Sequence, residues 1–188
     1  MSPSGAPATA VEPLRPASGT PRLRTRRLCL DPYVPGDEDG FVALFGDPRV
    51  HRWMGDGTSS EDADRALFGR IFSKVYARRL FDVWAVRYEA RLIGHAEIKP
   101  TEESGGHELV YALHPDTWGR GLGRELAGAI AAHGFGTLGL TEVHATVAAP
   151  NEASLALLHR LGFVHVRDLT EDDGSTTRLL TLHAAPLP

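Results

Sequence analysis

The residues of this chain best suited to chemistry form a glycine-rich stretch, Trp118-Gly119-Arg120-Gly121-Leu122-Gly123-Arg124-Glu125. An apolar, strand-like run precedes it, and the apolar residues after it recur at every fourth position, which indicates a helix. The first N–H groups of a helix lack intrahelical partners and lie at the positive end of its dipole, so the backbone alone can bind an anion such as a pyrophosphate. A tight strand-to-helix connection without a ligand explains the same glycines equally well.

Two other nucleotide motifs are excluded at this stretch. A dinucleotide-binding fingerprint needs Gly or Ala where Arg124 and Leu126 stand. A Walker A loop needs a lysine after its last glycine, and the chain's two lysines, Lys74 and Lys99, lie elsewhere.

A second informative segment spans residues 151–163. Asn151 follows a proline and can cap a short helix, whose apolar face would be Leu155, Leu158 and Leu161. Gly162 is suited to the position just after the last turn. A short packed helix accounts for most of this pattern, although not for its position one strand after an anion-binding turn.

Together the two segments resemble the GCN5-related N-acetyltransferase family, whose acetyl-CoA loop reads Arg/Gln-x-x-Gly-x-Gly/Ala. Trp118, Gly121 and Gly123 occupy those positions, with Trp in place of Arg or Gln. Trp-Gly-x-Gly is typical of the RimJ/RimL-like branch, which acetylates amino groups. The similarity covers about residues 22–183 in the expected order. The similar segments are 25–30, 47–55, 108–111 and 151–163.

This resemblance implies that acetyl-CoA is the co-substrate and that its pyrophosphate binds the glycine-rich turn. It also implies that the backbone N–H of Leu113 meets the thioester oxygen and that Asn151 holds the pantetheine amides. The residues expected to bind acetyl-CoA are Leu113, Trp118, Gly119, Arg120, Gly121, Leu122, Gly123, Arg124, Asn151 and Ser154.

The same resemblance assigns the chemistry. Glu108 would take a proton from the acceptor amine, although a solvent-facing carboxylate at a strand start is an equal alternative. Ser154 would contact the sulfur or relay a proton to it, unless it is only a small packing residue. Many family members use a tyrosine where this chain has Leu158, so the thiolate could instead take its proton from water. Trp53 and Met54 would lie at the acceptor entrance, where simple packing is the alternative.

Metal chemistry is not expected. His95-Ala96-Glu97 has the spacing of a zinc deaminase motif, but the chain has one cysteine and cannot supply the Cys-x-x-Cys half. His107 and His159 could reach the cleft, although surface or core positions are commoner for such residues.

The elements needed to position these residues predict a mixed α/β fold. The resemblance implies a mostly antiparallel seven-stranded sheet, splayed between its fourth and fifth strands and flanked by about four helices. One helix should follow 37–39 and another should start at Ser59 or Ser60, with Leu67, Ile71 and Val75 inward. The expected strands are 25–30, 81–86, 92–98, 108–113, 142–148, 163–169 and 176–183, the last two joined at Asp173-Gly174.

Composition predicts one domain over residues 22–188. The chain has 188 residues, of which 42% are hydrophobic, enough for one substantial core. Residues 1–21 contain five prolines and no apolar stretch, so we expect a disordered tail. No apolar run is long enough to span a membrane. Cys29 is alone, which favours a reducing cytoplasm.

Charge bears on partners. The net charge is −4, and the arginines among residues 1–27 make the remainder more acidic. An acidic body argues against nucleic acid and suits a cationic amine, although a merely soluble surface is an equal interpretation. A homodimer is compatible with the sequence.

The sequence therefore predicts an N-acetyltransferase that acts by direct attack in a ternary complex, without a covalent enzyme intermediate. The acceptor is the α-amine of a protein N-terminus or a small-molecule amine such as an antibiotic or polyamine. A non-catalytic acyl-CoA-binding or regulatory module is the alternative, supported by Leu158 alone.

Overall fold

The computed structural model describes residues 19–54, 60–102 and 105–185. Within them an eight-stranded sheet has the order β1-β2-β3-β4-β5-β6-β8-β7. The strands are β1 (Leu23–Arg24), β2 (Leu28–Asp31), β3 (Asp82–Tyr88), β4 (Arg91–Pro100), β5 (His107–Leu113), β6 (Glu142–Ala148), β7 (Val164–Thr170) and β8 (Thr176–His183). The mixed α/β expectation is confirmed, and the seven expected strands gain the two-residue β1.

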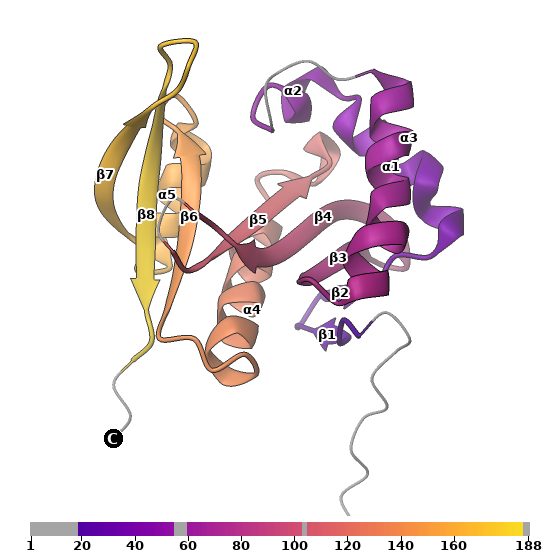
Figure 1. Cartoon of the computed structure of the whole chain (residues 1–188), viewed down its shortest axis with the longest axis horizontal. Helices are drawn as coiled ribbons and strands as arrows, with labels where there is room; N and C mark the ends of the chain where they lie inside the picture. Colours follow the sequence, from indigo (N-terminus) through magenta and orange to yellow (C-terminus); the bar gives the residue numbers. More distant parts are fainter. Residues whose placement is uncertain (1–18, 55–59, 103–104, 186–188) are drawn as a thin grey trace, which may run out of the picture.

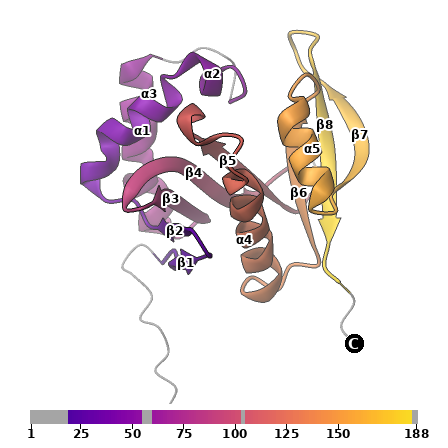
Figure 2. The ribbon, with the colours of Figure 1, turned by 180° about the vertical axis from the view of Figure 1, so that it is seen from behind.

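Helices cover both faces of the sheet (Figures 1 and 2). On one face lie α4 (Leu122–Gly136) and α5 (Glu152–Arg160), which enclose a core around Trp84, Leu126 and Ile130. On the other lie α1 (Glu38–Phe45), α2 (Pro48–His51) and α3 (Glu61–Arg70), packed over a second core around Phe41 and Phe68. Strand residues alternate between the two cores, as a pleated strand requires.

Strands β5 and β6 form the expected splay, and they diverge in Figure 1. They run parallel and pair at one register position, Glu108 with His144. β5 is fully paired with β4 along its other edge, from Pro100 with His107 to Gly94 with Leu113. Beyond Glu108, therefore, the β5 backbone that faces β6 is open for a ligand to use.

The helix that begins after Ser60 differs from expectation in its inward face. Ser60 is the N-cap, and its hydroxyl accepts from the Ala63 N–H. Phe68, Ile71 and Tyr76 are buried, whereas Leu67 is exposed and Val75 only partly buried. Ile71 is inward as predicted, and Val75 packs against the second core. The prediction of Leu67 as an inward residue was wrong, because Phe68 occupies that face of the helix. The π-helical segment Ile71–Tyr76 adds a residue to the turn, so that Tyr76 is the next fully inward residue.

The folded part begins before residue 22. Thr20 is buried, and the Pro21 carbonyl accepts a hydrogen bond of 2.7 Å from the Trp84 indole. Residues 19–21, which the sequence expectation gave to the tail, thus pack against the sheet. The remainder of that expected tail, residues 1–18, lies outside the described residues.

The C-terminal strands pair as expected. β7 and β8 pair antiparallel around Asp173-Gly174, where Gly174 has a φ of 81°.

Among the described helices, none is both long and apolar enough to cross a membrane.

Candidate functional site

The glycine-rich turn opens helix α4 with its N-terminus uncovered. Gly121 is the N-cap and has a φ of 74°, a left-handed conformation that glycine adopts without strain. No side chain caps this end, and the Glu125 N–H is the first to bond back to the Gly121 carbonyl. The N–H groups of Leu122, Gly123 and Arg124 therefore point outward from the helix end. Gly123 has a packing role, since a Cβ there would lie 2.8 Å from Leu157.

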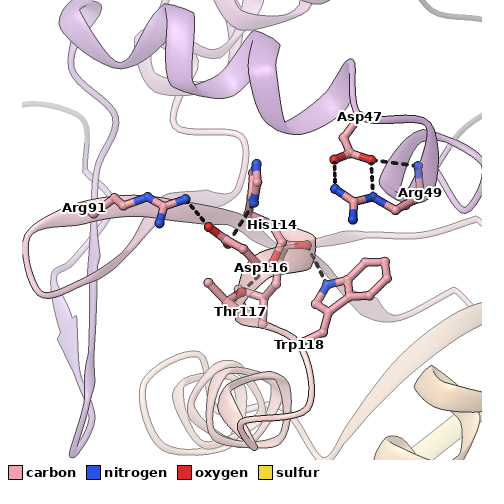
Figure 3. A network of polar contacts seen from close by, with 8 residues as sticks. Asp47, Arg49, Arg91, His114, Asp116, Thr117 and Trp118 are labelled. Carbon is pink, nitrogen blue, oxygen red and sulfur yellow. Dashed lines mark hydrogen bonds and ion pairs between the residues drawn. The ribbon is translucent and has the colours of Figure 1, made fainter.

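A polar network holds the segment between β5 and this turn (Figure 3). Asp116 in the 3₁₀ turn η3 (Pro115–Thr117) bonds Arg91 of β4 at 2.6 Å and His114 at 2.8 Å. The Trp118 indole N–H donates to the Leu113 carbonyl at 2.8 Å. These bonds tie the end of β5 to the start of the glycine-rich turn.

The same view shows a compact ion pair on α2. Asp47 accepts from the Arg49 N–H and guanidinium, at distances down to 2.7 Å. The hydrogen bonds from Arg49 lower the pKa of Asp47 to about 2. This pair fixes the start of α2, the helix that leads to Trp53 and Met54.

Arg27 braces the turn from the first part of the sheet. Its guanidinium donates to Glu125 at 2.7 Å and to the Arg120 carbonyl at 2.8 Å. The Arg120 side chain itself lies over the Tyr88 ring and donates to the Tyr88 hydroxyl at 3.1 Å. That side chain is directed away from the site where the sequence analysis expected it to bind an anion.

A cavity of about 950 Å³ collects the remaining predicted residues. Its size is in the range of small-molecule sites. Arg120 is not part of its lining. The predicted residues that line it are Trp53, Met54, Glu108, Leu113, Trp118, Gly119, Gly121, Leu122, Gly123, Arg124, Asn151 and Ser154.

The edge of β5 offers backbone groups to this cavity. The His114 N–H donates to Ile93 on β4 at 2.7 Å, so the adjacent pair, Gly94 with Leu113, is a non-hydrogen-bonded pair of the antiparallel ladder. The N–H groups of Leu113 and, two residues earlier, Tyr111 therefore point toward β6. The bond from Trp118 to the Leu113 carbonyl agrees with this direction.

Glu108 lies on the opposite face from α4, among polar neighbours. It accepts from the Thr146 hydroxyl at 3.2 Å and lies 3.7 Å from the Lys99 ammonium. Lys99 also lies 3.4 Å from Glu97, and Glu97 is 3.0 Å from the His95 ring. Only 13% of the Glu108 side chain is exposed, so Glu108 is mostly buried and is not a solvent-facing carboxylate.

Helix α5 begins as predicted and presents Ser154 to the cavity. The Asn151 side chain accepts from the Ser154 N–H at 3.2 Å, and Gly162 follows the helix with a φ of 95°. Leu158 is fully buried in the core. The side chain of Tyr111 lies on the same face of the sheet, and its hydroxyl is close to the Ser154 side chain.

Several lining residues were missed by the sequence reasoning. Lys99, Tyr111 and Thr146 line the cavity, as do the exposed Arg52 and Arg160. Lys99 carried a usable signal, since it alternates with His95 and Glu97 on one strand face. His159 instead bonds the Phe163 carbonyl at 3.0 Å on the surface, and His107 lies outside the lining.

Across residues 19–54, 60–102 and 105–185 no group of three or more His, Cys, Asp or Glu side chains is arranged to hold a metal.

Comparison with known proteins finds a matching family profile and related sequences. The profile of the acetyltransferase (GNAT) domain matches residues 27–164. A curated relative from Bacillus subtilis (strain 168), "Uncharacterized N-acetyltransferase YoaA", is 28% identical over 149 residues, which is 76% of this chain and 82% of the relative.

Solved structures share the fold. The ribosomal-protein-S5-alanine acetyltransferase from Vibrio fischeri has a TM-score of 0.71 and 16% identity, over 86% of this chain and 96% of its own. The spermidine N-acetyltransferase from Vibrio cholerae, solved with CoA and spermine, has a TM-score of 0.72 and 18% identity, over 85% of this chain and 96% of its own.

Proposed function

The chain belongs to the GNAT family of acetyltransferases, and we propose that it moves the acetyl group of acetyl-CoA to a primary amine by direct attack. One observation carries this proposal: the uncovered N-terminus of α4 opens into the same cavity that Glu108 lines. An anion-binding end and a potential base are thus within reach of one elongated ligand. The non-catalytic alternative gives no role to Glu108.

Residues along the cavity suit the parts of acetyl-CoA in order. The N–H groups at the start of α4 suit the pyrophosphate, with the exposed Arg124 and Arg160 beside it. The splayed edge of β5 suits the pantetheine arm, because the N–H groups of Tyr111 and Leu113 face the gap. Leu113 is nearer the turn, so its N–H suits a pantetheine amide or, as the sequence suggested, the thioester oxygen. Tyr111 lies closer to Glu108 and offers a second donor for that oxygen.

Bound acetyl-CoA supplies an activated acyl group. We assign to Glu108 the proton that the amine loses as its nitrogen bonds the acyl carbon. The C–S bond breaks and its electron pair leaves with the sulfur, near Ser154. A backbone N–H of β5 would stabilise the negative charge on the acyl oxygen.

The acceptor belongs to the proposal as well. Trp53 and Met54 line the cavity on the side of α2 and give the acceptor an apolar wall. Two structural neighbours act, by name, on an alanine of a ribosomal protein and on spermidine, so a protein N-terminus and a small amine both stay candidates. The Trp-Gly-x-Gly turn supports the RimJ/RimL-like branch and, with it, the N-terminus.

A screen for thiol release tests the function. The purified protein should release free thiol from acetyl-CoA when a peptide or small amine is added, with acetylated amine detected by mass. Glu108→Gln keeps shape and hydrogen bonding but takes no proton, so kcat should fall about 10²-fold or more, with acetyl-CoA affinity unchanged. Tight acetyl-CoA binding without turnover on any amine would instead favour the non-catalytic module. Wild-type rates in folded Glu108→Gln would contradict the role of Glu108 alone.

A further inference from the structure

A chain of polar side chains leads from the second core to Glu108. The Tyr33 hydroxyl lies 3.0 Å from Nδ1 of His95, and Nε2 of the same ring lies 3.0 Å from Glu97. The Lys99 ammonium lies 3.4 Å from the other oxygen of Glu97 and 3.7 Å from Glu108. The spacing that resembled a zinc motif in the sequence thus belongs to a network that ends at the carboxylate assigned as base.

Glu97 is a buried anion in this chain. In the neutral ring and in the cation alike, the Nε2–H of His95 can donate to Glu97 while Nδ1 bonds the Tyr33 hydroxyl. Burial alone would raise the pKa of Glu97, but its interactions with His95 and Lys99 lower that pKa. A buried carboxylate needs a cation beside it, and this is the position of the Lys99 ammonium.

The sheet register makes Lys99 serve two carboxylates. Lys99 pairs with Glu108 across the β4–β5 ladder, and Glu97 lies two residues along β4 on the same face. The ammonium faces one oxygen of Glu108, while the Thr146 hydroxyl donates to the other at 3.2 Å. Without a cation between them, the two carboxylates would repel each other, and one would take up a proton more readily.

Other charged groups bear on Glu108 less directly. His144 is its register partner on β6, but the His144 ring bonds β8 at 2.8 Å and lies 3.4 Å from Glu142. Arg52, which follows α2, lines the cavity with its guanidinium 4.5 Å from a tryptophan ring. Among the described residues, Lys99 is the only cationic side chain within salt-bridge distance of Glu108.

On the basis of the acetyl transfer proposed above, on which this step depends, we propose that Lys99 is a positioning residue that holds Glu108 ionised and in place for the acceptor amine. Glu97 and His95 hold Lys99 in turn. As the amine nitrogen bonds the acyl carbon, its N–H bond breaks, the electron pair stays on nitrogen and the proton goes to Glu108. The C–S electron pair leaves with the sulfur. Lys99 acts through its charge and gives up no proton.

Titration of the Glu108 carboxyl by NMR tests this role without turnover. In protein with isotope-labelled glutamate carboxyl carbons, the Glu108 signal is the one absent from Glu108→Gln. Lys99→Met keeps much of the side chain without its charge and should move the titration midpoint of Glu108 up by about one pH unit or more. Lys99→Arg keeps the charge and should stay near wild type. Glu97→Gln should move the midpoint down, because Lys99 then faces one carboxylate.

A double variant separates charge from packing. Lys99→Met combined with Glu97→Gln removes the unpaired carboxylate that could keep Lys99→Met from folding, and its midpoint should lie between those of the single variants. Lys74→Met is the control, because Lys74 is the chain's other lysine and is exposed away from the cavity. An unchanged midpoint in Lys99→Met, or equal midpoints in Glu97→Gln and the double variant, would overturn the proposal.

Activity gives the second measurement. With an active acceptor, the acidic limb of the kcat profile should move in the same directions as the midpoints. For Lys99→Met, kcat should fall severalfold at about pH 6 and recover at higher pH, with acetyl-CoA affinity unchanged by calorimetry. An equal fall at every pH would indicate a packing role and overturn the proposal. Absence of turnover in wild type on any amine would instead overturn the proposed function.

Discussion

At the scale of single residues, Gly121 is the position where backbone geometry and ligand access coincide. Its φ of 74° is unfavourable for any branched residue, and the nearest atom to a Cβ there is the Arg27 Nη2 at 3.6 Å. We expect Gly121→Val to weaken acetyl-CoA binding about tenfold or more, roughly 1.4 kcal/mol, by calorimetry. Gly139→Val is the control, because Gly139 has a φ of 68° in open space beyond α4. Equal affinities for acetyl-CoA in the two folded variants would contradict the assignment of the pyrophosphate to this turn.

Ionisation of the Glu97 carboxyl should make the stability of the protein depend on pH. Burial alone would raise its pKa, but the hydrogen bond and charge of His95, with Lys99, lower it below 4.5. A carboxyl whose folded pKa is depressed contributes stability above its unfolded pKa and loses it as pH falls through the folded pKa. The free energy of unfolding, from urea titrations, should therefore fall from about pH 5 downward. Glu97→Gln should show a shallower fall, and parallel curves would contradict the assignment.

At the scale of elements, the open end of α4 depends on its brace from the N-terminal part of the sheet. Arg27 is the only described side chain that bonds both Glu125 and the Arg120 carbonyl. Lysine cannot form this two-branched contact. We expect Arg27→Lys to weaken acetyl-CoA binding severalfold while kcat at saturation stays near wild type. Arg26→Lys, at an exposed neighbouring position, is the control. An equal loss of affinity there would contradict a specific role of the Arg27 contacts in positioning the turn.

The elements themselves were mostly readable from sequence, with failures of definite physical origin. The helix ends were predicted from the N-caps Ser60 and Asn151 and from the glycine after α5. Such residues are preferred at helix ends because they satisfy or accommodate the terminal backbone groups. The inward face was misplaced at Leu67, because Leu67 and Phe68 both fit a 3.6-residue pattern and only Phe68 is buried. The π-helical turn that makes Tyr76 a buried residue leaves no trace in such a pattern. Helix α2 was missed because four residues are too few for periodicity, although Asp47-Pro48 is a helix-start signal.

At the scale of the whole molecule, the sequence predicts the parts of the cavity lining that a single segment forms. It does not predict the parts formed where neighbouring strands bring residues together. The conformations of the glycine-rich turn and of the start of α5 depend mainly on their own residues, Gly121 and Asn151, so local sequence contains the information. The position of Lys99 beside Glu108 follows from the β4–β5 register, which no local pattern specifies. The approach of Tyr111 to Ser154 needs both the splay and the packing of α5 on the sheet. The resemblance supplied order along the chain, not these contacts.

The start of the folded molecule gives the last prediction. Trp84 is fully buried, and its indole N–H donates to the Pro21 carbonyl, so removing residue 21 leaves a buried donor unpaired at about 1–3 kcal/mol. A variant lacking residues 1–18 should melt like the full chain by calorimetry. One lacking 1–21 should melt lower, by about 2–4 °C per kcal/mol in a domain of this size.

Trp84→Phe completes this test as a double-mutant cycle. Phenylalanine has no indole N–H, so the further loss on removing residues 19–21 should be smaller in that background, leaving mainly the loss of the buried Thr20. An undiminished loss would assign the effect to Thr20 instead of Pro21. A lowered Tm on deleting 1–18 alone would mean that those residues also contribute to the fold, and the domain would then have to start earlier still.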